Sequence, residues 1–144
     1  MTRRFLMILA VAVLFLASCG KKTPTLNLLV WEGYADPSAV HSFEDRYHCR
    51  VSASYMGSSD ELVAKLRGGS AGNYDIISPS SDVATSIASA GLAAPLDLTK
   101  LPSYSQLSPQ LTSLPLVRLS GQVFGVPFMW GPNPMIYDLS LIHI

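Results

Sequence analysis

Short apolar runs alternate with amphipathic stretches through the first half of the chain. Residues 26–31 are almost wholly apolar, which is typical of a strand buried on both faces of a sheet. Val40, Phe43 and Tyr47 then recur at spacings of three and four residues, which predicts a helix with one apolar face. Residues 50–55 return to alternation and predict a second strand.

Local signals predict where the first two helices begin and where the second ends. Asp36 is a suitable N-cap, and Pro37 suits the first helical position. Ser58 and Glu61 have the spacing of a capping box, so a second helix is expected to begin there. That helix should end at the pair of glycines at residues 68–69.

A third strand and helix complete the pattern. The sequence "YDIIS", residues 74–78, predicts a strand, and "SSDVATSIASAGL", residues 80–92, predicts a helix that ends at Gly91. The order β-α-β-α-β-α indicates an α/β fold in which helices cover a parallel-type sheet.

Regularity decreases after this point. Residues 96–116 contain three spaced prolines and many serines, but leucines recur throughout, so we expect an ordered, irregular surface segment with short turns. "SGQVFGVP" predicts a turn that enters a strand, and Pro127 should end that strand. "FMWGPNPMIYD" follows, and the chain ends in "LSLIHI".

The N-terminus has the pattern of an export signal. Arg3 and Arg4 precede an apolar run of 13 residues at 5–17, which is too short to span a bilayer. The run ends in "LASC", which resembles a bacterial lipobox and implies cleavage before Cys19 and acylation of that cysteine. The alternative is a plain secretory signal that contains a cysteine. Two or three acyl chains would anchor the protein stably to a membrane.

Charge and cysteine content narrow the function classes further. The chain has 144 residues, which is enough for one domain with a core. Of these residues, 49% are apolar. Without Arg3 and Arg4, 8 basic residues face 10 acidic ones, a formal charge of −2, so nucleic acid is a poor candidate partner. Cys49 would then be the single free thiol, which we interpret as a half-buried strand residue.

Candidate chemistry lies where the predicted strands end. In open α/β sheets ligands bind beyond the carboxyl ends of the strands. Three loops therefore meet at one edge: "WEGY", "YMGSSD" and "SPSSD". The candidate ligand-binding residues in the first and third loops are Trp31, Glu32, Tyr34, Ser80, Ser81 and Asp82. A carboxylate between aromatic rings suits an ammonium group, through charge and cation–π attraction of roughly 0.5–2 kcal/mol per ring.

Each of these residues also has an ordinary structural interpretation. Trp31 alone could be a core aromatic, Glu32 a solvated acid, Ser80 a cap, and Asp82 an acid that favours its own helix N-terminus. Their shared edge behind a lipoprotein-type signal favours binding. No Ser-His-acid order, phosphate loop or metal-ligand spacing is present, and the histidines, residues 41, 48 and 143, fall in none of these loops. The sequence therefore predicts neither an enzyme, a metal site nor a cofactor.

The order of these blocks resembles a known family. "LLVWEGYADPSAVHSFEDRYHCRV", "YMGSSDELVAKLRGGSAGNYDIISPSSDVA" and "FGVPFMWGPNPMIYD" resemble substrate-binding lipoproteins of ABC importers, above all the spermidine/putrescine-binding group. The resemblance covers about residues 26–138. It implies a periplasmic-binding-protein-like, type II clamshell that closes on its solute by hinge bending and delivers it to permease subunits.

The resemblance also assigns residues. It implies that Trp31 and Tyr34 stack on the methylene chain of a polyamine and that Ser80 supplies a loop hydroxyl. Glu32 and Asp82 are acids where the family commonly has other residue types, which suits a cation but leaves the solute open. Trp130 lies where the crossing to the second lobe begins, so it either lines the cleft or packs at the hinge.

The resemblance further implies domain boundaries. We expect a signal peptide at 1–18, lipidated Cys19 and a tether at 19–25, part of the first lobe at 26–138, and a non-native tail at 139–144. Family members are more than twice as long, so half of the cleft should lie outside this chain. The open alternatives are a binder of another organic cation, an amino-acid-like, ferric or anionic solute, or, in a different class, an envelope lipoprotein enzyme or structural protein.

Overall fold

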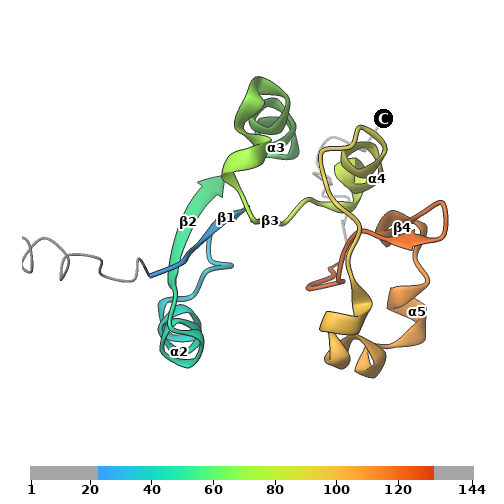
Figure 1. The fold of residues 1–144 in the computed structure, drawn as a ribbon. Coiled ribbons are helices and arrows are strands. Elements are labelled where there is room, and N and C mark those ends of the chain that lie inside the picture. Colours follow the sequence, from blue (N-terminus) through green and yellow to red (C-terminus); the bar gives the residue numbers. More distant parts are fainter. Residues whose placement is uncertain (1–22, 132–144) are drawn as a thin grey trace, which may run out of the picture. The chain divides into compact units, whose positions relative to one another are not determined.

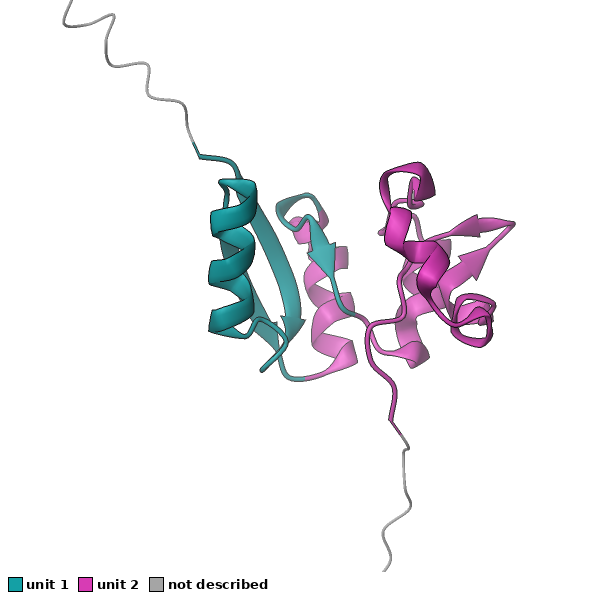
Figure 2. Ribbon diagram, turned by 90° about the horizontal axis from the view of Figure 1, so that it is seen from below, with its two compact units in different colours: residues 1–57, 72–78 teal, residues 58–71, 79–144 magenta. Residues whose placement is uncertain are grey.

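The protein's computed structural model describes residues 23–131 and contains a three-stranded parallel sheet, several helices and a small hairpin (Figure 1). Two compact units divide the chain: residues 1–57 with 72–78, and residues 58–71 with 79–144 (Figure 2). The predicted signal peptide, Cys19 and the final residues from Pro132 onward lie outside the described residues.

The first unit is built on the parallel sheet. Its strands are β1 (Thr25–Trp31), β2 (Arg50–Met56) and β3 (Ile76–Ile77), in the order β2-β1-β3. The register pairs Leu29 with Ser54 on one side and with Ile77 on the other. The parallel sheet of an α/β fold is therefore confirmed, but β3 has two residues where the pattern predicted five.

Helix α2 (Pro37–Tyr47) connects β1 to β2 and begins at Asp36 as the sequence predicts. The Asp36 carboxylate accepts hydrogen bonds from the backbone N–H groups of Ser38 and Ala39, which otherwise lack partners in the first turn. The helix ends at His48, which adopts a left-handed conformation with φ of 51°.

The core of the first unit is small. Leu29 is fully buried and Val30 and Met56 are nearly so, and adjacent Leu29 and Val30 point to opposite faces of β1. Both faces of the central strand are therefore covered at this point, as expected. The apolar stripe of α2 differs from the prediction, because Phe43 and Tyr47 remain 40% and 57% exposed.

The second unit contains α3 (Ser59–Lys65) and α4 (Ser81–Ser89). A wider helical turn at Leu66–Ser70 continues α3 and is interrupted at Gly69, whose φ of 88° is readily adopted only by glycine. The predicted glycine stop is therefore confirmed. Helix α4 ends with a bond from the Leu92 N–H to the Ile87 carbonyl across Gly91, which is also the expected end.

Short elements occupy residues 98–123, and at least two of them pack on α4 in the same unit. They comprise α5 (Pro109–Thr112), the 3₁₀ turns Leu98–Lys100, Pro102–Gln106 and Pro115–Val117, and strands β4 (Arg118–Leu119) and β5 (Gln122–Val123). Ser120 and Gly121 both have positive φ, which suits the two-residue turn of the β4–β5 hairpin. The core of this unit comprises Leu62, Leu66, Ile87, Ala88, Val117 and Val123.

Residues 96–116 thus form an ordered series of turns, as the pattern predicts. The strand expected in "SGQVFGVP" is limited to Gln122 and Val123, and its partner β4 was not anticipated. Cys49 is a free, half-buried thiol, but it lies one residue before β2 and not within the strand. No helix within residues 23–131 is long and apolar enough to cross a membrane.

Candidate functional site

The strands of the first unit end at one edge of the sheet. Trp31 is the last residue of β1 and is paired in register with Met56, the last residue of β2. At β3 the ladder continues one residue past the strand, because the Ser78 N–H donates to the Leu29 carbonyl at 3.1 Å. Within this unit, the loops that follow the strands therefore begin side by side, as the parallel order requires.

The loop after β1 is a tight turn. The Tyr34 N–H donates to the Trp31 carbonyl at 3.1 Å, and Gly33, the third position of this four-residue turn, has a φ of 85°. That angle is the one a type II turn requires at its third residue, which explains the glycine between two aromatics. Glu32 is exposed, whereas Trp31 and Tyr34 are half-buried. The turn thus holds both rings close to the strand end and presents the carboxylate to solvent.

Ser78 is a residue of this edge that the sequence analysis did not select. Its hydroxyl oxygen accepts a hydrogen bond of 3.3 Å from the Trp31 N–H, so β3 fixes the backbone from which the Trp31 ring projects. A matching pair lies at the start of the ladder, where the Asp75 carboxylate accepts from the Asn27 N–H at 2.7 Å. The signal for Ser78 was its place as the last residue of the strand predicted at residues 74–78.

In the second unit, Ser80 occupies the N-cap position of α4 without acting as a side-chain cap. Its carbonyl accepts from the N–H groups of Val83 and Ala84, at 3.2 and 3.1 Å, but its hydroxyl makes no capping bond. The interpretation of Ser80 as the cap of α4 therefore holds for its position but not for its side chain. Ser80 is half-buried and Ser81 is exposed.

Asp82 connects the first turns of two helices in this unit. Its Oδ1 accepts a hydrogen bond of 3.1 Å from the hydroxyl of Ser59, the first residue of α3. Ser58, one residue earlier, instead caps α3, because its hydroxyl accepts from the Glu61 N–H at 3.1 Å. Asp82 therefore does more than complement the positive end of its own helix.

Trp130 lies near the end of the described residues in an exposed apolar run. Its side chain is 81% exposed, beside Phe128 at 70% and Met129 at 65%. This exposure contradicts a core position within residues 23–131. Whether Trp130 lines a cleft or packs at a hinge remains a prediction for the longer protein.

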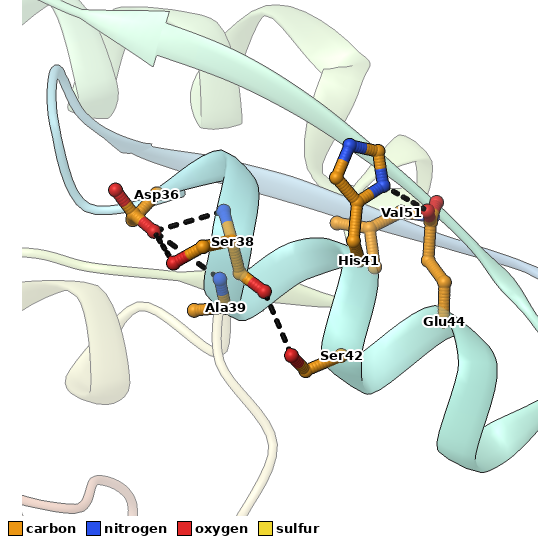
Figure 3. A network of polar contacts seen from close by, with 7 residues as sticks. All are labelled: Asp36, Ser38, Ala39, His41, Ser42, Glu44 and Val51. Atoms are coloured by element: carbon orange, nitrogen blue, oxygen red, sulfur yellow. Dashed lines mark hydrogen bonds and ion pairs between the residues drawn. The ribbon is translucent and has the colours of Figure 1, made fainter.

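A polar network runs along α2, from Asp36 in the loop after β1 to Val51 in β2 (Figure 3). At the helix start, the Ser38 hydroxyl and then the Ala39 and Ser38 N–H groups hold the pKa of Asp36 below its usual value. Farther along, the Glu44 Oε1 accepts from the Val51 N–H at 2.7 Å while its Oε2 lies 3.5 Å from the His41 Nδ1. This network fastens α2 to β2, so its role is structural.

The amino ends of β1 and β2 carry an open polar hollow lined by Thr23, Thr25, Glu44, Cys49 and Arg50. It lies at the opposite end of the strands from the predicted binding loops. Among residues 23–131, no group of three or more His, Cys, Asp or Glu side chains is placed to hold a metal ion.

Comparison with known proteins adds the decisive observation. Residues 38–143 match the sequence profile of the bacterial extracellular solute-binding proteins, which is more than half of the chain. The chain belongs to this family. The match includes Ser58, Ser59 and the Ser80–Asp82 segment, and it extends into the final residues as far as His143.

Characterised relatives of this solute-binding protein are polyamine binders by name. The putrescine-binding periplasmic protein PotF of Escherichia coli is 30% identical over 118 residues, covering 82% of this chain and 32% of the relative. Spermidine/putrescine-binding periplasmic protein 1 of Haemophilus influenzae is 29% identical over 117 residues, covering 81% and 32% respectively. The chain thus spans about a third of the length of these relatives.

Solved structures agree on the fold of the solute-binding protein. A putative spermidine/putrescine ABC transporter protein from Listeria monocytogenes superposes with a TM-score of 0.61 at 28% identity, covering 66% of this chain and 29% of that one. The substrate-binding protein PotD of Streptococcus pneumoniae gives the same TM-score at 22% identity, which supports the fold alone. The periplasmic-binding-protein-like fold is confirmed.

Proposed function

We propose that this chain is the N-terminal part of a lipid-anchored solute-binding protein that captures a polyamine and delivers it to the permease subunits of an ABC importer. The observation that carries the proposal is the Trp31–Tyr34 turn, in which two aromatic residues flank an exposed carboxylate at the end of β1. The names of the relatives, putrescine- and spermidine/putrescine-binding proteins, support the same solute class.

The chemistry of the turn suits a flexible chain with ammonium ends. Aromatic faces at Trp31 and Tyr34 pack against methylene groups and attract an adjacent cation, by about 0.5–2 kcal/mol for each ring in contact with a charge. Glu32 adds a negative charge that an anion binder would not place there. A dication with an apolar spacer therefore fits this turn better than an anionic solute does.

The second unit contributes its own candidate groups. Ser80 has a hydroxyl that its helix does not use for capping, so this hydroxyl is available to a ligand amine. Asp82 supplies a second carboxylate, with Ser81 beside it, and Trp130 supplies a further exposed ring. We propose each as a contributor to binding in the longer protein.

Solute capture in this family involves no chemical step. We propose that the protein delivers its solute to the permease chemically unchanged and uses no cofactor. The signal-like segment at 1–18 and Cys19 support an extracytoplasmic location with a lipid anchor. The relatives, which are named as periplasmic proteins, support the location alone. Residues 139–144 are proposed to be a non-native tail, and sequencing through the genomic locus tests this directly.

Thermal unfolding of the protein expressed from its complete genomic reading frame tests the proposal. Ligand at 100 times its Kd adds about 2.7 kcal/mol to the free energy of unfolding, which is readily detected as a rise in Tm. Putrescine and spermidine are expected to raise Tm, whereas an amino acid, ferric citrate and phosphate are not. A rise with one of those solutes and none with either polyamine would refute the polyamine assignment.

A further inference from the structure

Two adjacent serines at the start of α3 have separate partners. The Ser58 hydroxyl bonds to the backbone of its own helix at Glu61, whereas the Ser59 hydroxyl bonds to the carboxylate of Asp82, 23 residues away. A serine that caps stabilises its own helix. A serine that donates to a distant carboxylate instead restrains the carboxylate, and here it does so between two helices of the same unit.

The hydrogen bond from Ser59 uses one of the two carboxylate oxygens of Asp82 and leaves the other available. Ser59 donates to Oδ1 of Asp82, and no second hydrogen bond to this carboxylate occurs among residues 23–131. Asp82 is exposed and Ser59 is half-buried, so the acceptor faces solvent while its donor is held in the packed turn. A carboxylate fixed through one oxygen keeps the other oriented for an ammonium donor and loses less side-chain entropy when that donor binds.

We propose that Ser59 is a positioning residue that fixes Asp82 in a single conformation for a cationic ligand group, and thereby tunes affinity without contacting the ligand. This inference rests on the proposed function, because it assigns Asp82 to the binding of an amine. It adds Ser59, the first residue of α3, to the candidate residues.

The pair of serines provides a matched control. Ser59→Ala removes the donor to Asp82 but leaves the cap, whereas Ser58→Ala removes the cap but leaves the donor. Ser59→Thr retains a hydroxyl at the same position and serves as the rescue variant. Asp82→Ala reports what remains when the carboxylate that Ser59 acts on is absent.

Nuclear magnetic resonance on labelled protein expressed from the complete genomic reading frame gives a first measurement that needs no ligand. The Hα–Hβ couplings of Asp82 are expected to report one χ1 rotamer in the wild type, in Ser58→Ala and in Ser59→Thr, and averaged rotamers in Ser59→Ala. Unchanged Asp82 couplings in Ser59→Ala overturn the inference whatever the ligand data show.

Titration with putrescine in the same samples gives the second measurement. Ser59→Ala is expected to raise the Kd roughly 3- to 10-fold, within the range of one ordinary hydrogen bond, and to have no further effect in the Asp82→Ala background. Ser58→Ala should lower Tm but leave Kd unchanged. The inference is overturned if Ser59→Ala and the wild type have equal Kd. It is also overturned if Ser59→Ala weakens binding as much in the Asp82→Ala protein as in the wild type.

A wild type that binds neither putrescine nor spermidine refutes the proposed function and the part of the inference that concerns the ligand. The Asp82 couplings still decide whether Ser59 fixes Asp82.

Discussion

At the scale of single residues, one carboxylate organises the beginning of α2. Asp36 accepts from Ser38 and Ala39, and Pro37 between them supplies a fixed φ and no N–H that would need a partner. Capping is a local interaction of neighbouring residues, so its position follows directly from the order of side chains in the chain. For this reason the start of α2 agrees with its prediction to the residue.

Replacing Asp36 should destabilise the protein by an amount that depends on pH. The pKa of this carboxyl is lowered in the folded protein, first by the Ser38 hydroxyl, so its contribution to stability is present above the unfolded pKa and lost as pH falls through the folded pKa. Asp36→Ala is therefore expected to lower the urea midpoint at pH 7, with a deficit that shrinks in acid. Asp36→Asn, which still offers an acceptor oxygen, should lose less.

Asp45→Asn is the matched control for Asp36, because it removes a charge from the same helix without removing a cap. Its urea midpoint should follow that of the wild type across the same pH series. A deficit in Asp36→Ala that stays constant down to the acid limit would contradict the linkage.

Two serines have roles that the sequence did not predict, because their partners are distant in the chain. Ser78 and Ser59 were missed because their partners, Trp31 and Asp82, lie 47 and 23 residues away and are reached only through the fold. The hydroxyl of Ser80 is the opposite case: its place predicts a cap, and the structure shows the backbone carbonyl in that role without the side chain.

At the scale of elements, the sequence predicts order and type better than extent. The β-α-β-α-β-α order is confirmed because each element carries its own period and end signals. The length of β3 is not local information: it depends on how far β1 can pair with it, and pairing is limited to Leu28 and Leu29. The exposed stripe of α2 has the same origin, since periodicity identifies a face but not the partner that covers it.

The turn between β1 and α2 yields a prediction at this scale. Gly33→Ala is expected to destabilise the fold by about 1–2 kcal/mol, because φ at this position is 85° and a Cβ strains that conformation although it would meet no atom within 4 Å. Urea unfolding gives the difference directly.

Gly68→Ala is the control for this turn. Gly68 lies in a helical turn, has no positive φ and also has open space around it, so alanine should be neutral or slightly stabilising there. Equal destabilisation in both variants would mean that side-chain volume, and not backbone conformation, sets the cost.

At the scale of the whole molecule, the chain belongs to the solute-binding family and spans about a third of the length of its relatives. Family membership connects the local observations, since turns and serines at the ends of strands become candidate ligand groups only in that context. The sequence could propose candidate groups on separate loops, but not how they come together to bind a ligand, because that depends on contacts between residues far apart in the chain.

The proposed lipid anchor at Cys19 predicts how the complete protein partitions between a detergent phase and an aqueous phase. In a bacterial host, the wild type should enter the detergent phase of a Triton X-114 separation, whereas Cys19→Ala should remain in the aqueous phase, because the thiol that takes the lipid is gone. Cys49→Ala retains Cys19 and should behave as the wild type. Detergent partition of Cys19→Ala would refute acylation at this cysteine.

The proposed function predicts that ligand binding by the complete protein depends on Trp31. Trp31→Ala is expected to raise the Kd for spermidine about 2- to 30-fold, the equivalent of the roughly 0.5–2 kcal/mol of one cation–π contact, and Trp31→Phe should recover part of it because a smaller ring remains. Calorimetric titration measures both, and near-ultraviolet circular dichroism verifies that the variants are folded. Tyr47→Ala is the control, since Tyr47 lies on α2 outside the proposed site and is 57% exposed. The centroid of its ring lies 4.5 Å from that of Phe43. If folded Trp31→Ala binds spermidine as tightly as the wild type does, Trp31 is a strand-end core residue, and the cation site must be sought in other loops.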